Sequence, residues 1–238
     1  MAQLVVALDV ARPEEAEALV DRLYELDLIY KVGMEPLYGY GERIFSYLEA
    51  RDVRHFIDAK LHDIPRTVAA GVTQLVRHGT HIINVHALGG IEMMRAAVQA
   101  AEQRAKDLAM SPPPHVFAVT ILTSMNQSDL RDVGLGEDPL EDTLRLAQLA
   151  KDAGCSGVVC SAQEAGVIKA SLGKNFLTLT PGIRPAGTQA GDQKRIMTPQ
   201  AAVRAGSDYL VVGRPITEAA DPFAAAQAIL EEMNGARV

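Results

Sequence analysis

The chain of 238 residues contains eight short apolar segments at regular intervals, each followed by a stretch with helical periodicity. The apolar segments are rich in Val, Ile and Leu and almost continuously hydrophobic, which is typical of parallel strands buried on both faces. Strands are therefore expected at residues 4–10, 28–33, 54–61, 81–87, 115–122, 156–162, 176–182 and 208–214. Helices are expected at residues 12–26, 35–51, 65–79, 90–108, 138–154, 162–172, 199–206 and 221–233.

Local signals mark the ends of some of these helices. Asp138-Pro139 opens the predicted helix at 138–154, and Gly154 closes it. Proline in the first turn and glycine after the last turn are common start and stop signals. Eight strands alternating with eight helices predict a single (β/α)8 TIM barrel over residues 1–238, with a doubly wound open sheet as the alternative.

Composition and charge argue against several classes of protein. Hydrophobic residues make up 48% of the chain, too many for a disordered protein. The formal net charge of −7 argues against nucleic acid or an anionic membrane as a partner. Residues 1–10 hold only a short apolar run without a basic lead, so they predict neither a signal peptide nor a membrane span. Cys155 and Cys160 call for no disulfide, which fits a reducing cytoplasm.

Charged residues recur at the ends of the predicted strands, and the segment 56–64, FIDAKLHDI, holds three of them. In a (β/α)8 barrel the C-terminal strand ends form the active site. Asp58 and Lys60 are two residues apart on one strand, so both project to the same face, and Lys31 lies on the neighbouring strand. With Asp63 just beyond the strand end, they predict a close cluster of two acids and two bases. A salt-bridge network that only closes the barrel mouth is the alternative.

The segments after the seventh and eighth predicted strands have the composition of a phosphate site. The first, residues 181–193, is rich in glycine and contains Arg184 and Gln193, and the second contains Gly213 and Arg214. Glycine lets backbone N–H groups approach an anion, and arginine can donate two parallel hydrogen bonds to it. Barrels often bind phosphate with these two loops. A flexible surface loop with a salt-bridged Arg214 is the alternative.

Signals for other chemistry are weak. The six histidines show no metal-ligand spacing, so no metal site is predicted from them. The sequence contains no G-x-x-x-x-G-K-[ST], G-x-G-x-x-G or G-x-S-x-G motif.

The segments described above, taken together, resemble the orotidine 5′-phosphate decarboxylases of bacteria over essentially the whole chain. The D-x-K-x-x-D element alone also occurs in related sugar-phosphate decarboxylases and synthases, and it becomes specific in combination with the two phosphate-type segments. The segments that carry the resemblance are VALDV, YKVGMEPLYGYG, FIDAKLHDIPRTV, VHALGG, AVTILTSM, VVCSAQEA, LTPGIRPAGTQAGDQKRIMTP and YLVVGRPIT.

This resemblance implies decarboxylation of orotidine 5′-monophosphate to UMP, the last step of de novo pyrimidine nucleotide synthesis, without a metal or organic cofactor. It implies that Lys60 is the catalytic lysine and proton donor and that Asp58 lies beside the substrate carboxylate. Lys31 and Asp63 then complete the charge array. The other implied substrate contacts are Asp9 at a ribose hydroxyl, Thr123 and Ser124 at the pyrimidine, and Arg184, Gln193, Gly213 and Arg214 at the phosphate.

The same resemblance implies a homodimer with active sites at the subunit interface. The segment that contains Asp63, Ile64 and Thr67 is expected to reach the site of the partner subunit.

Two rival functions remain open from the sequence. Metal-dependent 3-keto-L-gulonate 6-phosphate decarboxylases resemble this chain, but they place a glutamate metal ligand on the second strand, where this chain has Lys31. A barrel that binds nucleotides without catalysis is the other rival. The intact set of Asp58, Lys60 and Asp63 argues against it.

Overall fold

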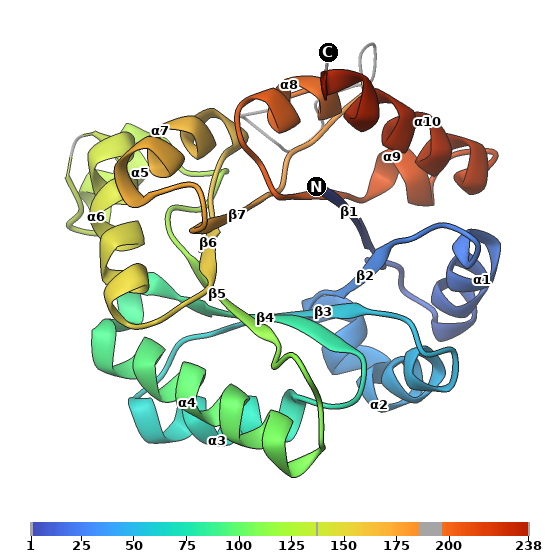
Figure 1. Cartoon of the computed structure of the whole chain (residues 1–238), viewed down its shortest axis with the longest axis horizontal. Coiled ribbons are helices and arrows are strands. Elements are labelled where there is room, and N and C mark those ends of the chain that lie inside the picture. The colour runs from blue at the N-terminus through green and yellow to red at the C-terminus, as the bar shows by residue number, and fades with distance from the viewer. Residues whose placement is uncertain (1, 137, 186–196, 238) are drawn as a thin grey trace.

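Eight parallel strands close into a barrel in chain order, and the last strand pairs with the first (Figure 1). The structure is a computed structural model that describes residues 2–136, 138–185 and 197–237. The closed order confirms the predicted (β/α)8 TIM barrel and excludes the open sheet. The strands are β1 (Gln3–Ala7), β2 (Ile29–Val32), β3 (His55–Leu61), β4 (Thr80–His86), β5 (His115–Val119), β6 (Gly157–Val159), β7 (Leu177–Thr180) and β8 (Tyr209–Val212).

Helices surround the barrel on the outside (Figure 1). They are α1 (Pro13–Leu23), α2 (Met34–Ala50), α3 (Pro65–Leu75), α4 (Ile91–Asp107), α5 (Gln127–Asp132), α6 (Pro139–Asp152), α7 (Ala162–Leu172), α8 (Pro199–Arg204), α9 (Arg214–Thr217) and α10 (Pro222–Asn234). Two short 3₁₀ turns, η1 (Ala87–Gly89) and η2 (Gly235–Arg237), complete the described elements. The eight predicted helices are present, whereas the short helices α5 and α9 were not predicted. No described helix combines the length and the apolar character that a membrane crossing requires.

The core has two layers because each strand buries both of its faces. The larger cluster lies between the outer face of the barrel and the helices, and the smaller cluster fills the barrel interior. Phe56, Phe117 and Tyr209 supply the largest interior side chains, and the last two pack edge to face with ring centroids 5.7 Å apart. A filled interior leaves the strand ends as the place for a polar site.

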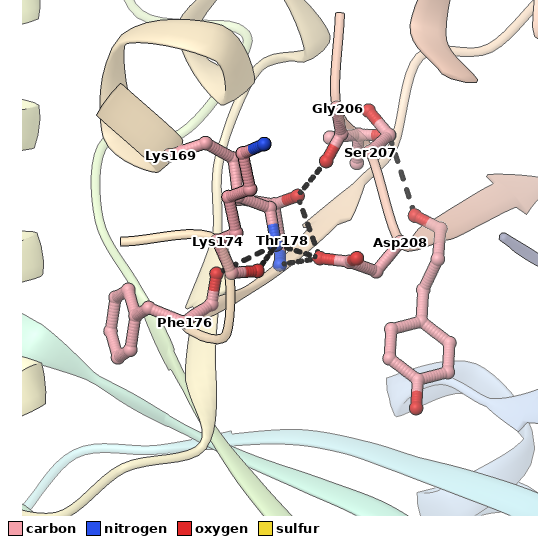
Figure 2. A network of polar contacts seen from close by, with 9 residues as sticks. Lys169, Lys174, Phe176, Thr178, Gly206, Ser207 and Asp208 are labelled. Carbon is pink, nitrogen blue, oxygen red and sulfur yellow. Dashed lines mark hydrogen bonds and ion pairs between the residues drawn. The ribbon is translucent and has the colours of Figure 1, made fainter. Parts of the chain in front are cut away.

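A polar network joins α7 to β7 and to the entry of β8 (Figure 2). The Lys169 ammonium donates to the backbone oxygens of Lys174 and Phe176, at 3.0 and 2.8 Å, and to Asp208 Oδ2 at 2.6 Å. The same Asp208 oxygen accepts the backbone N–H of Thr178 at 2.7 Å. These contacts fix the starts of the two strands whose far ends lead into the predicted phosphate segments.

Buried His55 of β3 and partly buried His81 of β4 make the fold sensitive to acid. Burial lowers the pKa of His55 and of His81 to about 4 each. In the unfolded chain both titrate near 6.5, so between pH 6.5 and pH 4 the unfolded state binds more protons and stability falls as the pH falls. We expect the free energy of unfolding to drop by on the order of 1–2 kcal/mol per histidine between pH 7 and pH 5.

Urea unfolding at the two pH values measures this effect. His81→Gln should lose less stability on acidification than the wild type, because one of the two protonation sites is gone. Equal unfolding free energies at pH 7 and pH 5 for the wild type would show that the histidines do not control acid stability.

Candidate active site

Four charged side chains meet at the C-terminal ends of the first three strands. The ammonium of Lys31 on β2 lies 2.9 Å from Asp9 Oδ1, just after β1, and 3.3 Å from Asp58 Oδ2 on β3. The ammonium of Lys60, also on β3, lies 2.7 Å from Asp58 Oδ1. The predicted pairing of Asp58 with Lys60 and Lys31 is present, and Asp9 joins it. We call Asp9, Lys31, Asp58 and Lys60 the charge array.

The charges in the array hold one another in the ionised state. Burial alone would raise the pKa of Asp58, but Lys31 and Lys60, with hydrogen bonds to the carboxylate, keep that pKa below its usual value. Burial alone would lower the pKa of Lys31, but Asp58 and Asp9 outweigh it and keep the pKa raised. Because an isolated buried charge is costly, removing one member leaves its neighbours poorly compensated.

Strand β3 is irregular where it carries the array. Ile57 pairs with Ile83 of β4, and the next pair is Leu61 with Val85, so three residues of β3 stand opposite one of β4. Lys60 lies within this bulge with a φ of +49°. For a residue with a Cβ this left-handed conformation costs about 1–2 kcal/mol. Asp58 and Lys60 therefore meet through a bulge, and not through the regular alternation assumed from the sequence.

Asn84, the β4 residue opposite the bulge, was missed by the sequence reasoning. Its side chain is fully buried, donates to Asp58 Oδ1 at 2.7 Å and accepts the backbone N–H of Lys60 at 2.8 Å. A single amide within the apolar run of residues 81–87 was the available signal, because a buried amide must find hydrogen-bond partners.

Gly33 was also missed, and its role is steric. A Cβ at this position would lie 2.4 Å from Asp9 Oδ1 and 2.7 Å from Lys31 Nζ. Both distances are shorter than atoms tolerate, so a side chain here would displace the ion pair between β1 and β2. Gly33 has a φ of −82°, a backbone conformation that any residue can adopt, so only the lack of space requires glycine here.

We therefore expect Gly33→Ala to lower kcat/KM by at least about tenfold, equivalent to ~1.4 kcal/mol. The clashing atoms are the ends of two side chains that can move, so the melting temperature should change little. Steady-state kinetics and thermal unfolding of the same preparation measure both quantities. Gly39→Ala on α2 is the control, because a Cβ there meets no atom within 4 Å. Unchanged kinetics in Gly33→Ala would show that the Asp9–Lys31 pair is not needed in its present geometry.

Two cavities open on either side of the charge array and share Lys31, Asp58 and Lys60 in their walls. The first, about 610 Å³, extends toward β1, β7 and β8 and is lined by Asp9, Arg184, Gly213 and Arg214 among others. The second, about 500 Å³, extends toward β5 and β6. Its walls are mostly apolar and include Phe56, Val119, Ile121, Leu122, Val159, Cys160 and Leu179, with Thr123 and Ser124 at the loop after β5.

The first cavity ends in two arginines. Arg184 is buried, and its guanidinium donates to the carbonyl oxygen of Ile183 at 3.0 Å. Burial and the nearby charge of Arg214 lower the pKa of Arg184, whereas Glu218 opposes this effect. Two cations that repel each other across a concave wall favour the binding of an anion between them. Gln193 lies outside the described residues.

The segment after β3 does not join the array of its own chain. Asp63 is exposed, its Oδ1 accepts the backbone N–H of Ile64 at 2.6 Å, and within the described residues it makes no ion pair. Ile64 and Thr67 are exposed as well. The predicted cluster of two acids and two bases therefore contains Asp9 in place of Asp63.

The array does not have the donor set of a metal site. In the part of the chain that the structure describes, no group of three or more His, Cys, Asp or Glu side chains is placed to hold a metal ion. The space between the carboxylates of Asp9 and Asp58 is taken by the Lys31 ammonium. A lysine between the two acids would repel a divalent cation there.

Fold and site together define a (β/α)8 barrel enzyme whose lysine–aspartate array lies beside an arginine-lined cavity suited to an anionic small molecule. Residues 2–229 match the orotidine 5′-phosphate decarboxylase / HUMPS family. An orotidine 5′-phosphate decarboxylase of Shewanella sediminis is 47% identical over 97% of both chains, and one of Chromobacterium violaceum is 48% identical over 97% of this chain and 91% of its own. The crystal structure of orotidine 5′-phosphate decarboxylase from Lactobacillus acidophilus has a TM-score of 0.84 and 37% identity, covering 98% of this chain and all of that one.

The chain belongs to the orotidine 5′-phosphate decarboxylase / HUMPS family.

Proposed function

We propose that this chain is a carboxy-lyase that converts orotidine 5′-monophosphate into UMP, the last step of de novo pyrimidine nucleotide synthesis. The observation that carries the proposal is the position of the charge array between an arginine-lined cavity and an apolar cavity. A nucleotide has the matching order of parts, with an anionic phosphate at one end and a flat pyrimidine at the other. The family and its curated relatives support this substrate.

In this proposal each part of the substrate contacts a different set of residues. Arg184, Gly213 and Arg214, together with Gln193, bind the phosphate. Asp9 accepts a hydrogen bond from a ribose hydroxyl. The pyrimidine enters the apolar cavity, where Thr123 and Ser124 lie on the loop after β5 and contact the ring. The carboxylate that is lost then faces Asp58 and Lys60, which line both cavities.

Lys60 carries the chemistry in this arrangement. When the bond to the carboxylate carbon breaks, CO₂ leaves and the electron pair stays on the ring carbon, with little delocalisation. A fixed ammonium stabilises that charge and then transfers a proton to the carbon. Asp58, at 2.7 Å from the Lys60 ammonium, holds the donor in place, and Lys31 keeps Asp58 ionised. These residues perform the reaction without a metal or organic cofactor.

The proposal is tested by UMP formation from orotidine 5′-monophosphate in the presence of EDTA. We expect the rate to be the same with and without EDTA. A metal-dependent 3-keto-L-gulonate 6-phosphate decarboxylase would release CO₂ from its own substrate and lose that activity in EDTA. A barrel that only binds nucleotides would bind UMP and turn over neither substrate. Either result would overturn the proposal.

We also propose that the chain acts as a homodimer in the cytoplasm, with no nucleic acid or membrane partner. Exposed apolar side chains sit after neighbouring strands on the same side of the barrel: Met34 and Tyr38 after β2, Ile64 after β3, Leu88 after β4 and Leu122 after β5. Apolar side chains gathered on one face favour burial by a partner. A second copy there would place the partner subunit's segment with Asp63, Ile64 and Thr67 over this chain's site.

Mixing two inactive chains tests whether the sites are shared. Lys60→Ala removes the proton donor from its own site, and Asp63→Ala removes the acid proposed to act in the partner's site. In a mixed dimer one site carries both changes and the other carries neither. We expect mixing to restore activity, up to about one quarter of the wild-type value if exchange is random, because half of the dimers are mixed and half of their sites are intact.

Subunit exchange is verified with two differently sized tags before the activity is measured. Mixing Lys60→Ala with Asp58→Ala is the control, since both residues belong to the same chain's array and no intact site can form. A mixture of Lys60→Ala and Asp63→Ala that stays as inactive as this control would show that each chain builds its own site.

A further inference from the structure

The side chain of Asn84 joins the backbone of the β3 bulge to the charge array. Asn84 lies on β4 and is fully buried. Its Oδ1 accepts the backbone N–H of Lys60 at 2.8 Å, and its Nδ2 donates to Asp58 Oδ1 at 2.7 Å. The same Asp58 oxygen accepts from the Lys60 ammonium at 2.7 Å. One amide therefore contacts both the backbone of Lys60 and the carboxylate that holds its side chain.

The bulge explains why a side chain is needed at this point. In a regular parallel pair a backbone carbonyl of the neighbouring strand would accept the Lys60 N–H. Here Asp58, Ala59 and Lys60 stand opposite Asn84 alone, and Lys60 has a φ of +49°. The Asn84 side chain takes the place of the missing carbonyl and keeps the left-handed conformation that directs the Lys60 side chain toward Asp58.

We propose that Asn84 is a positioning residue for the reaction, which orients the Lys60 ammonium and the Asp58 carboxylate through these two hydrogen bonds. Asn84 is absent from the walls of both cavities, so it acts through the array and not on the substrate. The inference rests on the proposed decarboxylation, because it assigns Asn84 a part in the same site.

Two variants separate the two hydrogen bonds. Asn84→Ala removes both, and Asn84→Asp keeps an acceptor for the Lys60 N–H but replaces the donor to Asp58 by a second carboxyl. We expect both variants to lower kcat by at least about a hundredfold at pH 8, because a small displacement of the reacting group has effects of this size. KM for orotidine 5′-monophosphate and the affinity for UMP should change by less than about threefold, since the phosphate and pyrimidine contacts are intact.

The pH dependence of kcat in Asn84→Asp distinguishes a positioning role from a purely structural one, because a purely structural role predicts no change in this dependence. Two adjacent carboxyls share one proton, so the pKa of the pair is raised. Once protonated, the new carboxyl can donate to Asp58 as the amide does. The ratio of variant to wild-type kcat should therefore rise by at least about tenfold between pH 8 and pH 6. Among the described residues, the charged or titratable groups that interact with Asp58 are Lys31, Lys60 and His86, with Asp9 bound to Lys31, and all four are the same in both proteins.

Thr80→Val is the matched control. Thr80 lies at the other end of β4, where its hydroxyl contacts His55 of β3 at 3.0 Å, so its loss also removes a buried polar contact between these two strands. This variant should lose stability and keep kcat per folded active site. If Asn84→Ala loses stability but no more kcat than Thr80→Val, Asn84 only supports the fold.

Wild-type turnover in the same assay separates this inference from the proposed function. A wild type that forms no UMP would overturn the proposed function. If the wild type is active, either of two results would overturn the positioning role. One is a kcat of Asn84→Asp above about a third of the wild-type value at pH 8. The other is a ratio of variant to wild-type kcat that stays constant from pH 8 to pH 6. If Asn84→Ala does not fold, the isosteric Asn84→Asp decides alone.

Discussion

Lys60→Ala is expected to lower kcat by at least about a thousandfold, within the range that general acid catalysis contributes. The variant deletes the proposed proton donor of the array, and the other lysine of the array cannot take its place, because Lys31 is held between Asp9 and Asp58. The fold should remain intact, since Asp58 keeps Lys31 and Asn84 as partners and the Lys60 side chain is itself partly exposed. Single-turnover and steady-state assays of UMP formation measure the loss.

Binding of UMP and thermal unfolding show whether the Lys60→Ala site is still formed. Lys174→Ala is the control, because this exposed lysine lies far from the array along the chain, between α7 and β7, and should leave kcat unchanged. If folded Lys60→Ala kept more than about a tenth of the wild-type kcat, a loss of only ~1.4 kcal/mol, Lys60 would not be the proton donor.

Arg214→Ala is expected to lower kcat/KM for orotidine 5′-monophosphate by at least about tenfold, since one charge-assisted hydrogen bond contributes ~1.5–3 kcal/mol. Arg214 begins α9, separated from β8 only by Gly213, and lines the same cavity as Arg184. The phosphate is remote from the reacting carbon, so these contacts act only through binding energy. If that energy also helps to complete the site, kcat falls together with affinity.

Orotidine without its phosphate tests the assignment directly. It should be a very poor substrate for the wild type, and Arg214→Ala should change its turnover little, because the arginine then has no anion to bind. Arg204→Ala, an exposed arginine on α8, is the control and should behave as wild type with both substrates. If Arg214→Ala lowered kcat/KM equally for orotidine and for orotidine 5′-monophosphate, Arg214 would support the fold and would not bind the phosphate.

The barrel could be predicted from the sequence because strand burial and helix periodicity are local signals that repeat along the chain. The short helices were missed because their periodicity is too brief to detect. Cap residues were the available signals: Asn126 and Asp129 form a capping box around α5, and Pro215 follows the start of α9. A cap pattern without a long apolar run after it is weak evidence, since it also occurs in turns.

Only the charged residues of the site could be predicted from the sequence. Asp58, Lys60 and Lys31 stand out in apolar strands, and their contacts are present in the structure. The bulge in β3 could not be predicted, because register depends on the neighbouring strand. Asn84 and Gly33 were not predicted because their roles also depend on neighbouring strands. Asn84 acts through a hydrogen bond across the bulge. Gly33 matters because a side chain at this position would clash with the Asp9–Lys31 ion pair.

The seam between the first and last strands has a consequence for how the protein is made. Gln3 to Val6 pair with Tyr209 to Val212. During synthesis this edge of β1 therefore stays unpaired until nearly the whole chain has left the ribosome. The strands that carry the charge array emerge early, whereas Arg214, which begins α9 after β8, emerges late. An exposed strand edge that persists this long invites pairing with other chains. We therefore expect a truncated chain that ends before β8 to be inactive and prone to aggregate, because the edge of β1 then has no partner strand.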